Sequence, residues 1–415
     1  MGSEITGKRL NILFVANEIF PDAHGGVHTY VYEIAERLVS LGHNVCVLTK
    51  KVEKSHPSVE NINGIKIYRY ENKECGFSFL NQILSILSIN TELKKLVRAF
   101  RFDLISMHSP HAAFGVNLSK TAKKIPKVYT FYALLAEEEF YDVYGKKYSW
   151  YQWRRYIKPF WFSIYLQLAR WLEKRGLKSA QKIISLSDFT SQRLIKEYKI
   201  AAAKIAQIPA GVDTERFKPA SDKNAVRKVL DLSQYSQILF TVRRLVPRMG
   251  LDNLIKAMPL VLEKFPEVFL VIGGQGPLQQ ELKQLAEEFR LGAKIILTGF
   301  IEDEKLPLYY QACDLFILPS KANEGFGIVT LEALASGVPV LATPIGGSIE
   351  ILNKLDKNLL FKDISPDSIA SLIIEYLTNT KKRTEIENKC RQFILENYTW
   401  DKAAKQTDKL FLDIL

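Results

Sequence analysis

Residues 314–340 read DLFILPSKANEGFGIVTLEALASGVPV, and they contain a complete strand, loop, helix and strand pattern. The apolar run DLFILPS is typical of a buried strand, and the helix-period segment 326–336 follows a short glycine-containing loop. A second apolar run, PVLATP (339–344), comes directly after that segment. Strand, helix and strand in this order predict one unit of an open parallel sheet with helices on both faces.

The same alternation runs through the rest of the chain, in two blocks. The first block has the apolar runs LNILFVAN (10–17), NVCVLTK (44–50), FDLISMH (102–108), KVYTFY (127–132) and KIISLS (182–187). The second has QILFTVR (237–243), VFLVIGG (268–274), KIILTG (294–299), DLFILPS (314–320) and PVLATP. Helix-period segments lie between them at 26–41, 251–264, 277–290 and 326–336. The sequence therefore predicts an α/β protein of two doubly wound, Rossmann-like domains that face each other across a cleft.

The domain boundary is expected near IPAGVDTERFKP (208–219), where prolines and glycine interrupt the pattern. We predict a first domain at 1–208 and a second at 209–397. The last helix, at about 398–415, is expected to pack back on the first domain.

Bulk composition indicates a folded cytoplasmic protein. Of 415 residues, 47% are hydrophobic and 25% charged, as in ordinary globular domains. The four cysteines show neither metal-binding nor disulfide spacing, and the first strand begins too early for a signal peptide. No apolar stretch approaches the roughly 20 residues that span a bilayer.

The net positive charge of the chain lies in its first half. Residues 1–209 hold 31 Lys and Arg against 18 Asp and Glu, whereas residues 210–415 hold 26 against 27. Such a field favours anionic partners, which include nucleic acid, a phosphorylated acceptor and a membrane surface, although a soluble basic protein fits as well. No nucleic-acid recognition motif is present, so we predict no nucleic-acid partner.

Residues 140–178 contain four of the five tryptophans, with many other aromatic and basic residues. That mixture suits peripheral membrane contact through an interfacial helix, and hence a place at the inner membrane face. It also suits a carbohydrate-stacking platform or a large helical core element.

The loop between strand and helix in the opening stretch is a candidate phosphate site. Gly325 and Gly327 let backbone N–H groups approach a phosphate, and the following helix N-terminus adds partial positive charge. Glu324 and Glu332 stand eight residues apart, which brings them to similar faces of a helix. Two carboxylates beside such a loop suit the vicinal hydroxyls of a sugar and a ribose.

Three other strand ends carry candidate residues. TVRRLVPRMGLD (241–252) places Arg243, Arg244 and Arg248 at a strand–helix junction, where guanidinium groups bind an anion. Gly274, in the turn GGQGP, allows backbone approach, and so do the two glycines that end NEIFPDAHGG (17–26), Gly25 and Gly26.

His108 ends the strand FDLISMH and is expected to face the cleft, where it would hydrogen-bond a substrate hydroxyl.

We predict neither a cofactor nor a divalent metal. The chain has no DxD motif and no compact group of His, Asp and Glu. Arginines and helix dipoles are expected to balance phosphate charge instead.

These motifs together resemble the retaining glycosyltransferases of family 4 (glycosyl transferases group 1), which have the GT-B fold. The resemblance rests on HGG (24–26), SLSDFT (185–190), IPAGVD (208–213), the arginine-rich turn, GGQGP, EGFGIVTLEALASGVPV and the closing Tyr398–Trp400 segment. It implies retaining, metal-independent transfer of a hexose from a nucleotide-sugar donor, with UDP-glucose or a similar sugar favoured and GDP-mannose next. The acceptor would be a hydroxyl of a glycan or lipid-linked molecule in cell-surface polysaccharide or glycolipid synthesis.

The resemblance also implies roles for residues of this sequence. Glu324 would contact donor-sugar hydroxyls, Glu332 the ribose, Arg244 the diphosphate, and His108 the transferred sugar. The expected donor-binding set is completed by Gly25, Gly26, Arg243, Arg248, Gly274, Gly325, Phe326, Gly327, Ile328 and Val329. The leaving phosphate would help to deprotonate the acceptor, so no protein nucleophile is required.

Two residues depart from the family pattern. Met249 stands where the family usually has a lysine, and Tyr132 where it often has a histidine. The alternative hypothesis is therefore a catalytically degenerate protein that binds a nucleotide-sugar or carbohydrate.

Overall fold

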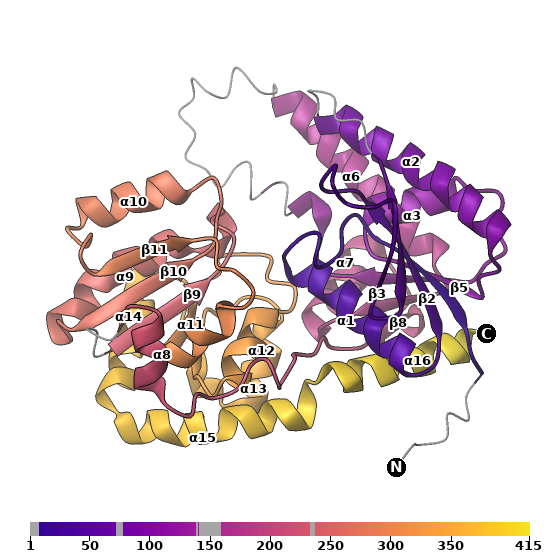
Figure 1. Ribbon diagram of the computed structural model, residues 1–415. Helices are drawn as coiled ribbons and strands as arrows, with labels where there is room; N and C mark the ends of the chain where they lie inside the picture. The colour runs from indigo at the N-terminus through magenta and orange to yellow at the C-terminus, as the bar shows by residue number, and fades with distance from the viewer. Residues whose placement is uncertain (1–7, 72–77, 138–139, 141–158, 233–236) are drawn as a thin grey trace, which may run out of the picture. The chain divides into compact units, whose positions relative to one another are not determined.

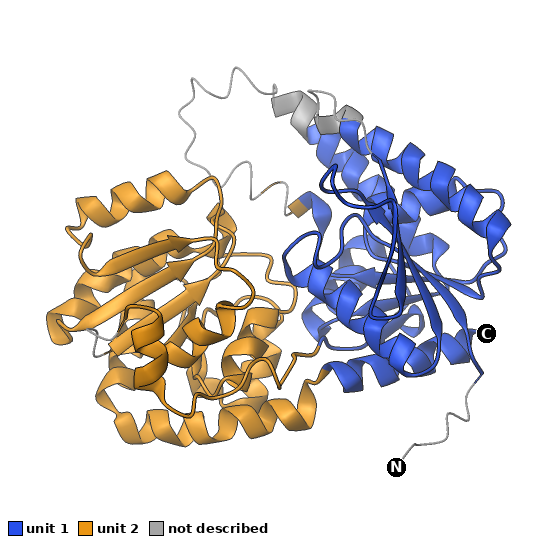
Figure 2. Cartoon of the chain, in the orientation of Figure 1, with its two compact units in different colours: residues 1–136, 156–210, 400–415 blue, residues 137–155, 211–399 orange. Residues whose placement is uncertain are grey.

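The computed structural model describes residues 8–71, 78–137, 140, 159–232 and 237–415 (Figure 1). The chain divides into two compact units (Figure 2). The first comprises Met1–Ala136, Tyr156–Ala210 and Trp400–Leu415, and the second Glu137–Arg155 and Gly211–Thr399. The second segment of the first unit ends at Ala210, and the boundary was expected near residue 208.

The first unit is built on an eight-stranded sheet in the order β3-β4-β2-β1-β5-β6-β7-β8. Its strands are β1 (Asn11–Val15), β2 (Asn44–Lys50), β3 (Val59–Ile62), β4 (Ile65–Tyr70), β5 (Leu104–Met107), β6 (Lys127–Phe131), β7 (Lys182–Ser185) and β8 (Ile205–Gln207). All pair in parallel except β3, which runs antiparallel to β4.

The parallel sheet expected for this unit carries one antiparallel strand, β3, at its edge. Asn63 and Gly64 have φ of 49° and 83°, as required by the two-residue turn that Asn-Gly favours in a hairpin. Strands β3 and β4 were not among the strands predicted from the apolar runs.

Helices cover the first sheet on its faces. They are α1 (Gly26–Ser40), α2 (Ser78–Ala99), α3 (Pro110–Asn117), α6 (Pro159–Ser179), α7 (Asp188–Tyr198) and α16 (Trp400–Ile414), with the 3₁₀ turn η1 (Ala202–Lys204). Helices α2, α3 and α6 pack in a row, and α1 packs against α16. Every residue of β5 and β6 is buried, as expected for parallel strands with helices on both faces.

The C-terminal helix α16 is part of the first unit. Arg37 of α1 donates to Asp401 at 2.9 Å, and His43 lies 2.8 Å from Asp408. The buried rings of Tyr30 and Trp400 meet edge to face with centroids 5.7 Å apart. These contacts lie along one side of an amphipathic helix, which explains why the last helix packs far from its neighbours in sequence.

The second unit has a five-stranded, wholly parallel sheet in the order β11-β10-β9-β12-β13. The strands are β9 (Gln237–Val242), β10 (Val268–Gly273), β11 (Ile295–Gly299), β12 (Leu315–Leu318) and β13 (Val340–Ala342). The helices are α8 (Lys223–Val229), α9 (Leu251–Lys264), α10 (Gln279–Glu288), α11 (Leu306–Ala312), α12 (Ile328–Ala335), α13 (Ser348–Leu355), α14 (Pro366–Thr378) and α15 (Thr380–Asn397), with the 3₁₀ turns η2 (Pro247–Met249) and η3 (Lys357–Leu359). Helix α9 packs between α10 and α14, and α11 between α8 and α12.

Of the aromatic segment 140–178, residues 141–158 lie outside the described residues. Its C-terminal part forms α6. Among the helices that the structure describes, none is both long enough and apolar enough to cross a bilayer.

Asp314 ties helix α8 to the second sheet. Its carboxylate accepts from the N–H of Ile238 at 2.7 Å, from Arg227 at 2.7 Å and from Lys223 at 2.9 Å. Burial alone would raise the pKa of this carboxyl, but the two cations and the N–H bond hold it below its ordinary value of 3.8.

We predict that Asp314→Asn lowers the free energy of unfolding by about 3 kcal/mol at pH 7, because it leaves the buried Arg227 without its counter-charge. A carboxyl with a lowered folded pKa stabilises the fold above its unfolded pKa. That stabilisation is lost as pH falls through the folded pKa, so the difference between variant and wild type should shrink in acid. Urea unfolding from pH 7 to 3 measures both effects, with the exposed Asp413→Asn as the control. Equal stability of the two variants at pH 7 would contradict the prediction.

Candidate functional site

The second sheet reverses its strand order between β9 and β12. From β9 the chain moves outward through β10 and β11, and then returns to the other side of β9 as β12 and β13. The loops that follow β9 and β12 therefore leave in opposite directions, and the space between them is the usual ligand position in an open parallel sheet. Arg243 begins the first loop, and Ser320 and Glu324 lie in the second.

These three side chains form a buried network at the reversal. Arg243 donates through Nη1 to Ser320 Oγ at 2.9 Å, and through Nη2 to Glu324 Oε2. Ser320 Oγ also donates to Glu324 Oε2, at 2.9 Å. Burial alone would raise the pKa of the Glu324 carboxyl, but the two bonds and the charges of Arg243 and Arg248 hold it below its ordinary value. Glu324 is therefore an anion at neutral pH.

The three arginines of the predicted anion site have different surroundings. Arg243 is buried, Arg244 is exposed, and Arg248 is half-buried. The Nη1 of Arg248 lies 3.4 Å from the carbonyl oxygen of Asn323, and its own carbonyl accepts from the N–H of Lys321 at 2.8 Å. The turn that carries Arg248 is thus joined to the loop that carries Glu324.

The glycine loop is as short as the sequence indicated. Gly327, with φ of 88°, precedes the first residue of α12. Phe326 is buried, and its carbonyl lies 3.3 Å from Ser348 Oγ. Gly325, Ile328 and Val329 are half-buried around the start of the helix. Backbone N–H groups at this helix start are suited to bind an anion.

Glu332 lies further along α12 and has a separate partner. Tyr310 Oη donates to its Oε2 at 2.7 Å. Burial raises the pKa of the Glu332 carboxyl to about 6, against the opposing effects of the Tyr310 bond and of Arg216. The two glutamates paired in the sequence analysis therefore differ: Glu324 stays ionised, whereas Glu332 titrates close to neutral pH.

The first sheet has its own reversal, between β1 and β5. Ser109, after β5, donates to Asn17, after β1, at 2.9 Å. Asp22, in the loop between Asn17 and Gly26, forms a buried ion pair with Arg69 of β4. The Nη2 of Arg69 donates to Asp22 at 2.9 Å. Gly25 and Gly26 are exposed at the end of this loop.

His108 is buried beside the same reversal. Its Nε2 lies 3.0 Å from Ser106 Oγ, and its Nδ1 lies 2.8 Å from Tyr132 Oη. Burial lowers the pKa of the imidazole to about 3, so His108 is neutral at physiological pH. Both ring nitrogens thus have partners within the first unit, and Tyr132, which departs from the family pattern, is one of them.

Sequence reasoning missed several residues of these sites. Ser320, Tyr310 and Asn17 each bond a predicted site residue or loop, and Tyr132, noted in the sequence only as a departure from the family pattern, bonds His108. Ser320, Tyr132 and Asn17 directly follow or end an apolar run, and that position was the available signal. Tyr310 gave no such signal, because its role depends on how α11 packs beside α12.

Two family models match consecutive parts of the chain. The model described as Glycosyltransferase Family 4 matches residues 24–216, and the model described as Glycosyl transferases group 1 matches residues 222–393. The chain is a family 4 glycosyltransferase.

Relatives agree with this assignment. An uncharacterized glycosyltransferase of Methanocaldococcus jannaschii is 26% identical over 97% of this chain and 98% of its own length. A GDP-mannose-dependent alpha-(1-6)-phosphatidylinositol monomannoside mannosyltransferase of Mycobacterium tuberculosis is 31% identical, over 59% of this chain and 65% of its own length. HepE of Anabaena, solved in complex with UDP and glucose, superimposes with a TM-score of 0.73 at 20% identity, covering 97% of this chain and 99% of that one. Such likeness shows that this glycosyltransferase has the GT-B fold.

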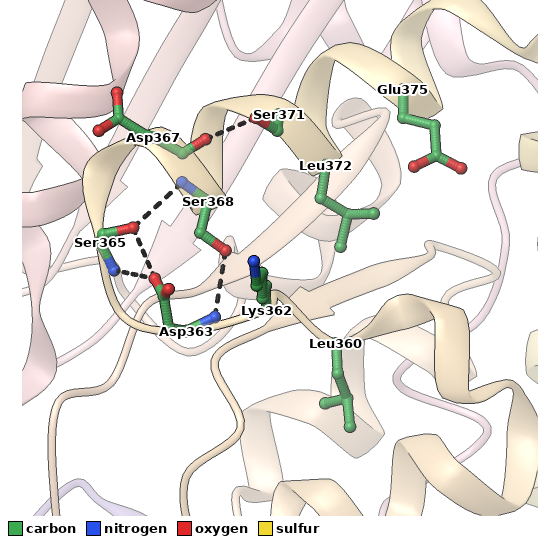
Figure 3. A pocket seen from close by; sticks show the side chains of 9 residues that line it. All are labelled: Leu360, Lys362, Asp363, Ser365, Asp367, Ser368, Ser371, Leu372 and Glu375. Carbon is green, nitrogen blue, oxygen red and sulfur yellow. Dashed lines mark hydrogen bonds between the residues drawn. The ribbon is translucent and has the colours of Figure 1, made fainter.

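The hollow drawn in Figure 3 lies elsewhere in the second unit. It has a volume of about 480 Å³ and is lined by residues that lead into α14 or lie on it, among them Lys362, Asp363 and Ser368. Asp363 and Ser365 bond one another at the start of the helix. None of the residues predicted to bind donor lines this hollow, so it is not the candidate site.

Gly274 supports the position of Arg243 and gives a test of the site's construction. Its φ is 116°, and a Cβ there would lie 1.9 Å from the carbonyl oxygen of Arg243. We predict that Gly274→Ala lowers the free energy of unfolding by at least about 1 kcal/mol, because alanine disfavours positive φ and the backbone would have to move. The control is Gly292→Ala, where nothing lies within 4 Å of the added Cβ. Similar denaturation midpoints for the two variants would refute the prediction.

Proposed function

We propose that this glycosyltransferase transfers a hexose from a nucleotide-sugar to a hydroxyl of a glycan or lipid-linked acceptor, with retention of anomeric configuration and without a divalent metal. One observation carries the proposal: an ionised Glu324, the exposed Arg244 and the start of α12 gather around the strand reversal of the second sheet. Carboxylate, guanidinium and helix start together offer acceptors for sugar hydroxyls and donors for a diphosphate.

The charges of the site suit departure of a nucleoside diphosphate. Arg244 and Arg248 supply positive charge beside the helix start, which stabilises negative charge developing on the leaving phosphate. Glu332, on the same helix as the glycine loop, suits the ribose hydroxyls. Gly25 and Gly26 of the first unit and Gly274 of the second are proposed to allow close approach of the donor to the backbone.

Retention is proposed without a protein nucleophile. Glu324 has a lowered pKa and one oxygen already bonded to Arg243 and Ser320, which makes it a weak base and a poor nucleophile. The departing phosphate would take the acceptor proton as the new glycosidic bond forms on the same face of the sugar. The enzyme then contributes positioning and electrostatic stabilisation. His108 is proposed to hydrogen-bond the transferred sugar, with Ser106 and Tyr132 orienting its ring.

Among donors we favour UDP-glucose or a similar UDP-sugar, with GDP-mannose next. HepE binds UDP and glucose, which supports the first choice. The mycobacterial relative depends on GDP-mannose, which supports the second.

A lipid-linked acceptor would be met at the inner membrane face, and α6 offers a surface for peripheral contact. Its exposed side includes Ile164 and Trp171, at 41% and 44% exposure, together with Arg170 and Arg175. The guanidinium of Arg175 lies 4.9 Å from the Trp171 ring. Exposed aromatic and basic side chains on one helix are the composition of an interfacial helix.

The neighbouring helix extends this surface. Gln82 of α2 donates to Tyr165 of α6 at 3.0 Å, which brings the two helix starts together. Ile83 and Leu87, one turn apart on α2, are also exposed. Both neighbouring helices therefore carry exposed apolar side chains.

The second candidate function, nucleotide-sugar binding without transfer, is favoured by Met249. This residue is buried in η2, where it adds no charge to the site. A donor that binds but is neither transferred nor hydrolysed would support this candidate.

The first test is calorimetric titration of UDP-glucose, UDP-N-acetylglucosamine, GDP-mannose and ADP-glucose in the presence of a chelator. We expect one donor to bind wild type at micromolar Kd and Arg244→Ala to weaken it about tenfold or more, because a charged bond to phosphate is lost. The exposed Lys389→Ala on α15 is the control. If none of the four donors binds, or if binding needs a divalent metal, the corresponding part of the proposal fails.

Donor affinity should depend on pH through Glu332. Its carboxyl has a pKa of about 6, and only the ionised form accepts two ribose hydroxyls. We expect a constant Kd above pH 7 that rises as pH falls through 6. Glu332→Gln should weaken binding at pH 7.5 and remove this pH dependence. A wild-type Kd that is flat between pH 5 and 7.5 would argue against contact of Glu332 with the donor.

Membrane contact is tested by co-sedimentation with vesicles that contain anionic lipid. The double variant Ile164→Glu/Trp171→Glu is expected to reduce the bound fraction about tenfold at low salt, because two apolar anchors become negative. Val229, 74% exposed on α8 of the second unit, gives the control Val229→Glu. If wild type stays in solution with these vesicles, the membrane part of the proposal is abandoned.

A further inference from the structure

Arg243 is placed differently from the other two arginines of its turn. Its side chain is only 4% exposed, and two of its guanidinium nitrogens donate to Ser320 and Glu324 inside the second unit. Arg244, the next residue, is exposed. Because this guanidinium is buried and these two bonds fix its direction, the predicted role of Arg243 in binding the diphosphate is not the one its geometry favours.

The two oxygens of the Glu324 carboxylate have different surroundings. Oε2 accepts from both Arg243 and Ser320. Oε1 accepts from no side chain or N–H among the described residues. A carboxylate oxygen can accept two hydrogen bonds, so Oε1 remains able to bind a hydroxyl group.

We infer that Arg243 is a positioning residue for the donor sugar: it holds Glu324 by one oxygen and directs the other oxygen to a hydroxyl of the transferred hexose. This inference rests on the proposed function, because it assigns Glu324 to a sugar hydroxyl. Arg243 itself touches neither the sugar nor the phosphate.

Electrostatics support the same role. Burial on its own would raise the pKa of Glu324, and the charged or polar groups that oppose burial are Arg243, Ser320 and Arg248. The first two also fix the orientation of the carboxylate. Removing Arg243 therefore loosens Glu324 and raises its pKa, so that protonation begins to remove an acceptor for the sugar.

The experiment compares the affinity of the best nucleotide-sugar with that of its free nucleoside diphosphate, which lacks the sugar. Arg243→Gln should weaken nucleotide-sugar binding about tenfold or more, as for loss of a charged hydrogen-bond network, and leave nucleoside diphosphate binding within about twofold. Arg243→Lys, which keeps the charge, should recover part of the loss. Equal weakening of both ligands by Arg243→Gln would show direct phosphate contact and overturn the inference.

A double-variant cycle tests whether Arg243 acts through Glu324. In the background of Glu324→Gln, the further change Arg243→Gln should alter nucleotide-sugar affinity less than about twofold. Ser320→Ala removes the second donor on the same oxygen, so it should show a smaller loss with the same ligand preference. This variant keeps the inference testable if Arg243→Gln does not fold. Full additivity in the cycle, or equal loss of both ligands in Ser320→Ala, would contradict it.

A third measurement needs no donor. Carboxyl-carbon NMR of glutamate-labelled protein, with Glu324→Gln used to assign the resonance, gives the pKa of Glu324 in wild type and in Arg243→Lys and Arg243→Gln. We expect the pKa to rise in Arg243→Gln and to rise less in Arg243→Lys. An unchanged pKa would overturn the inference whether or not a donor binds, whereas failure of wild type to bind any donor while the pKa rises would refute the proposed function alone.

Discussion

The reversal of strand order in each sheet is the constraint on which both candidate sites depend. In the second sheet β9 and β12 are neighbours, but the chain leaves them toward opposite edges. The loops beyond these two strands can therefore approach one another without a connecting helix between them. Arg243 and Glu324 stand 81 residues apart in sequence and still form a buried ion pair there. Without that reversal, the arginine would be a buried charge without a partner, which is strongly destabilising.

The first sheet also reverses its strand order, but the side chains beside its reversal differ chemically from those in the second sheet. The bond between Asn17 and Ser109 joins loops 92 residues apart in sequence, across the reversal between β1 and β5. Charge is kept away from the interior beside it, because His108 is neutral and bonded to Ser106 and Tyr132. The ion pair of Asp22 and Arg69 joins the loop that precedes Gly25 and Gly26 to strand β4. The reversal of the second sheet thus carries a buried ion pair, whereas the histidine beside the reversal of the first sheet is neutral.

The sequence predicted the parallel strands and the glycine loop well, because apolar runs, glycines and helix period are local properties of the chain. The sequence did not predict features that depend on how distant segments pack together. Arg243 and Arg244 are adjacent and chemically identical, yet only the loop after β12 determines which of them is buried. Tyr310 became visible as the partner of Glu332 only once α11 was placed beside α12. The β3–β4 hairpin is different, because the Asn63-Gly64 pair that forms its turn is visible in the sequence but was not used to predict a hairpin.

The pairing of Val212 with Thr399 has a consequence for how this chain can be rebuilt. The N–H of Val212 donates to the carbonyl of Tyr398 at 3.0 Å, and Val212 and Thr399 form an isolated parallel bridge. The segment Gly211–Thr399 therefore begins and ends at the same place. Segments whose ends lie together are the ones that chains accept as insertions. This segment, which together with Glu137–Arg155 makes up the second unit, can therefore be exchanged as one continuous piece for its counterpart from a relative without detaching α16 from the first unit.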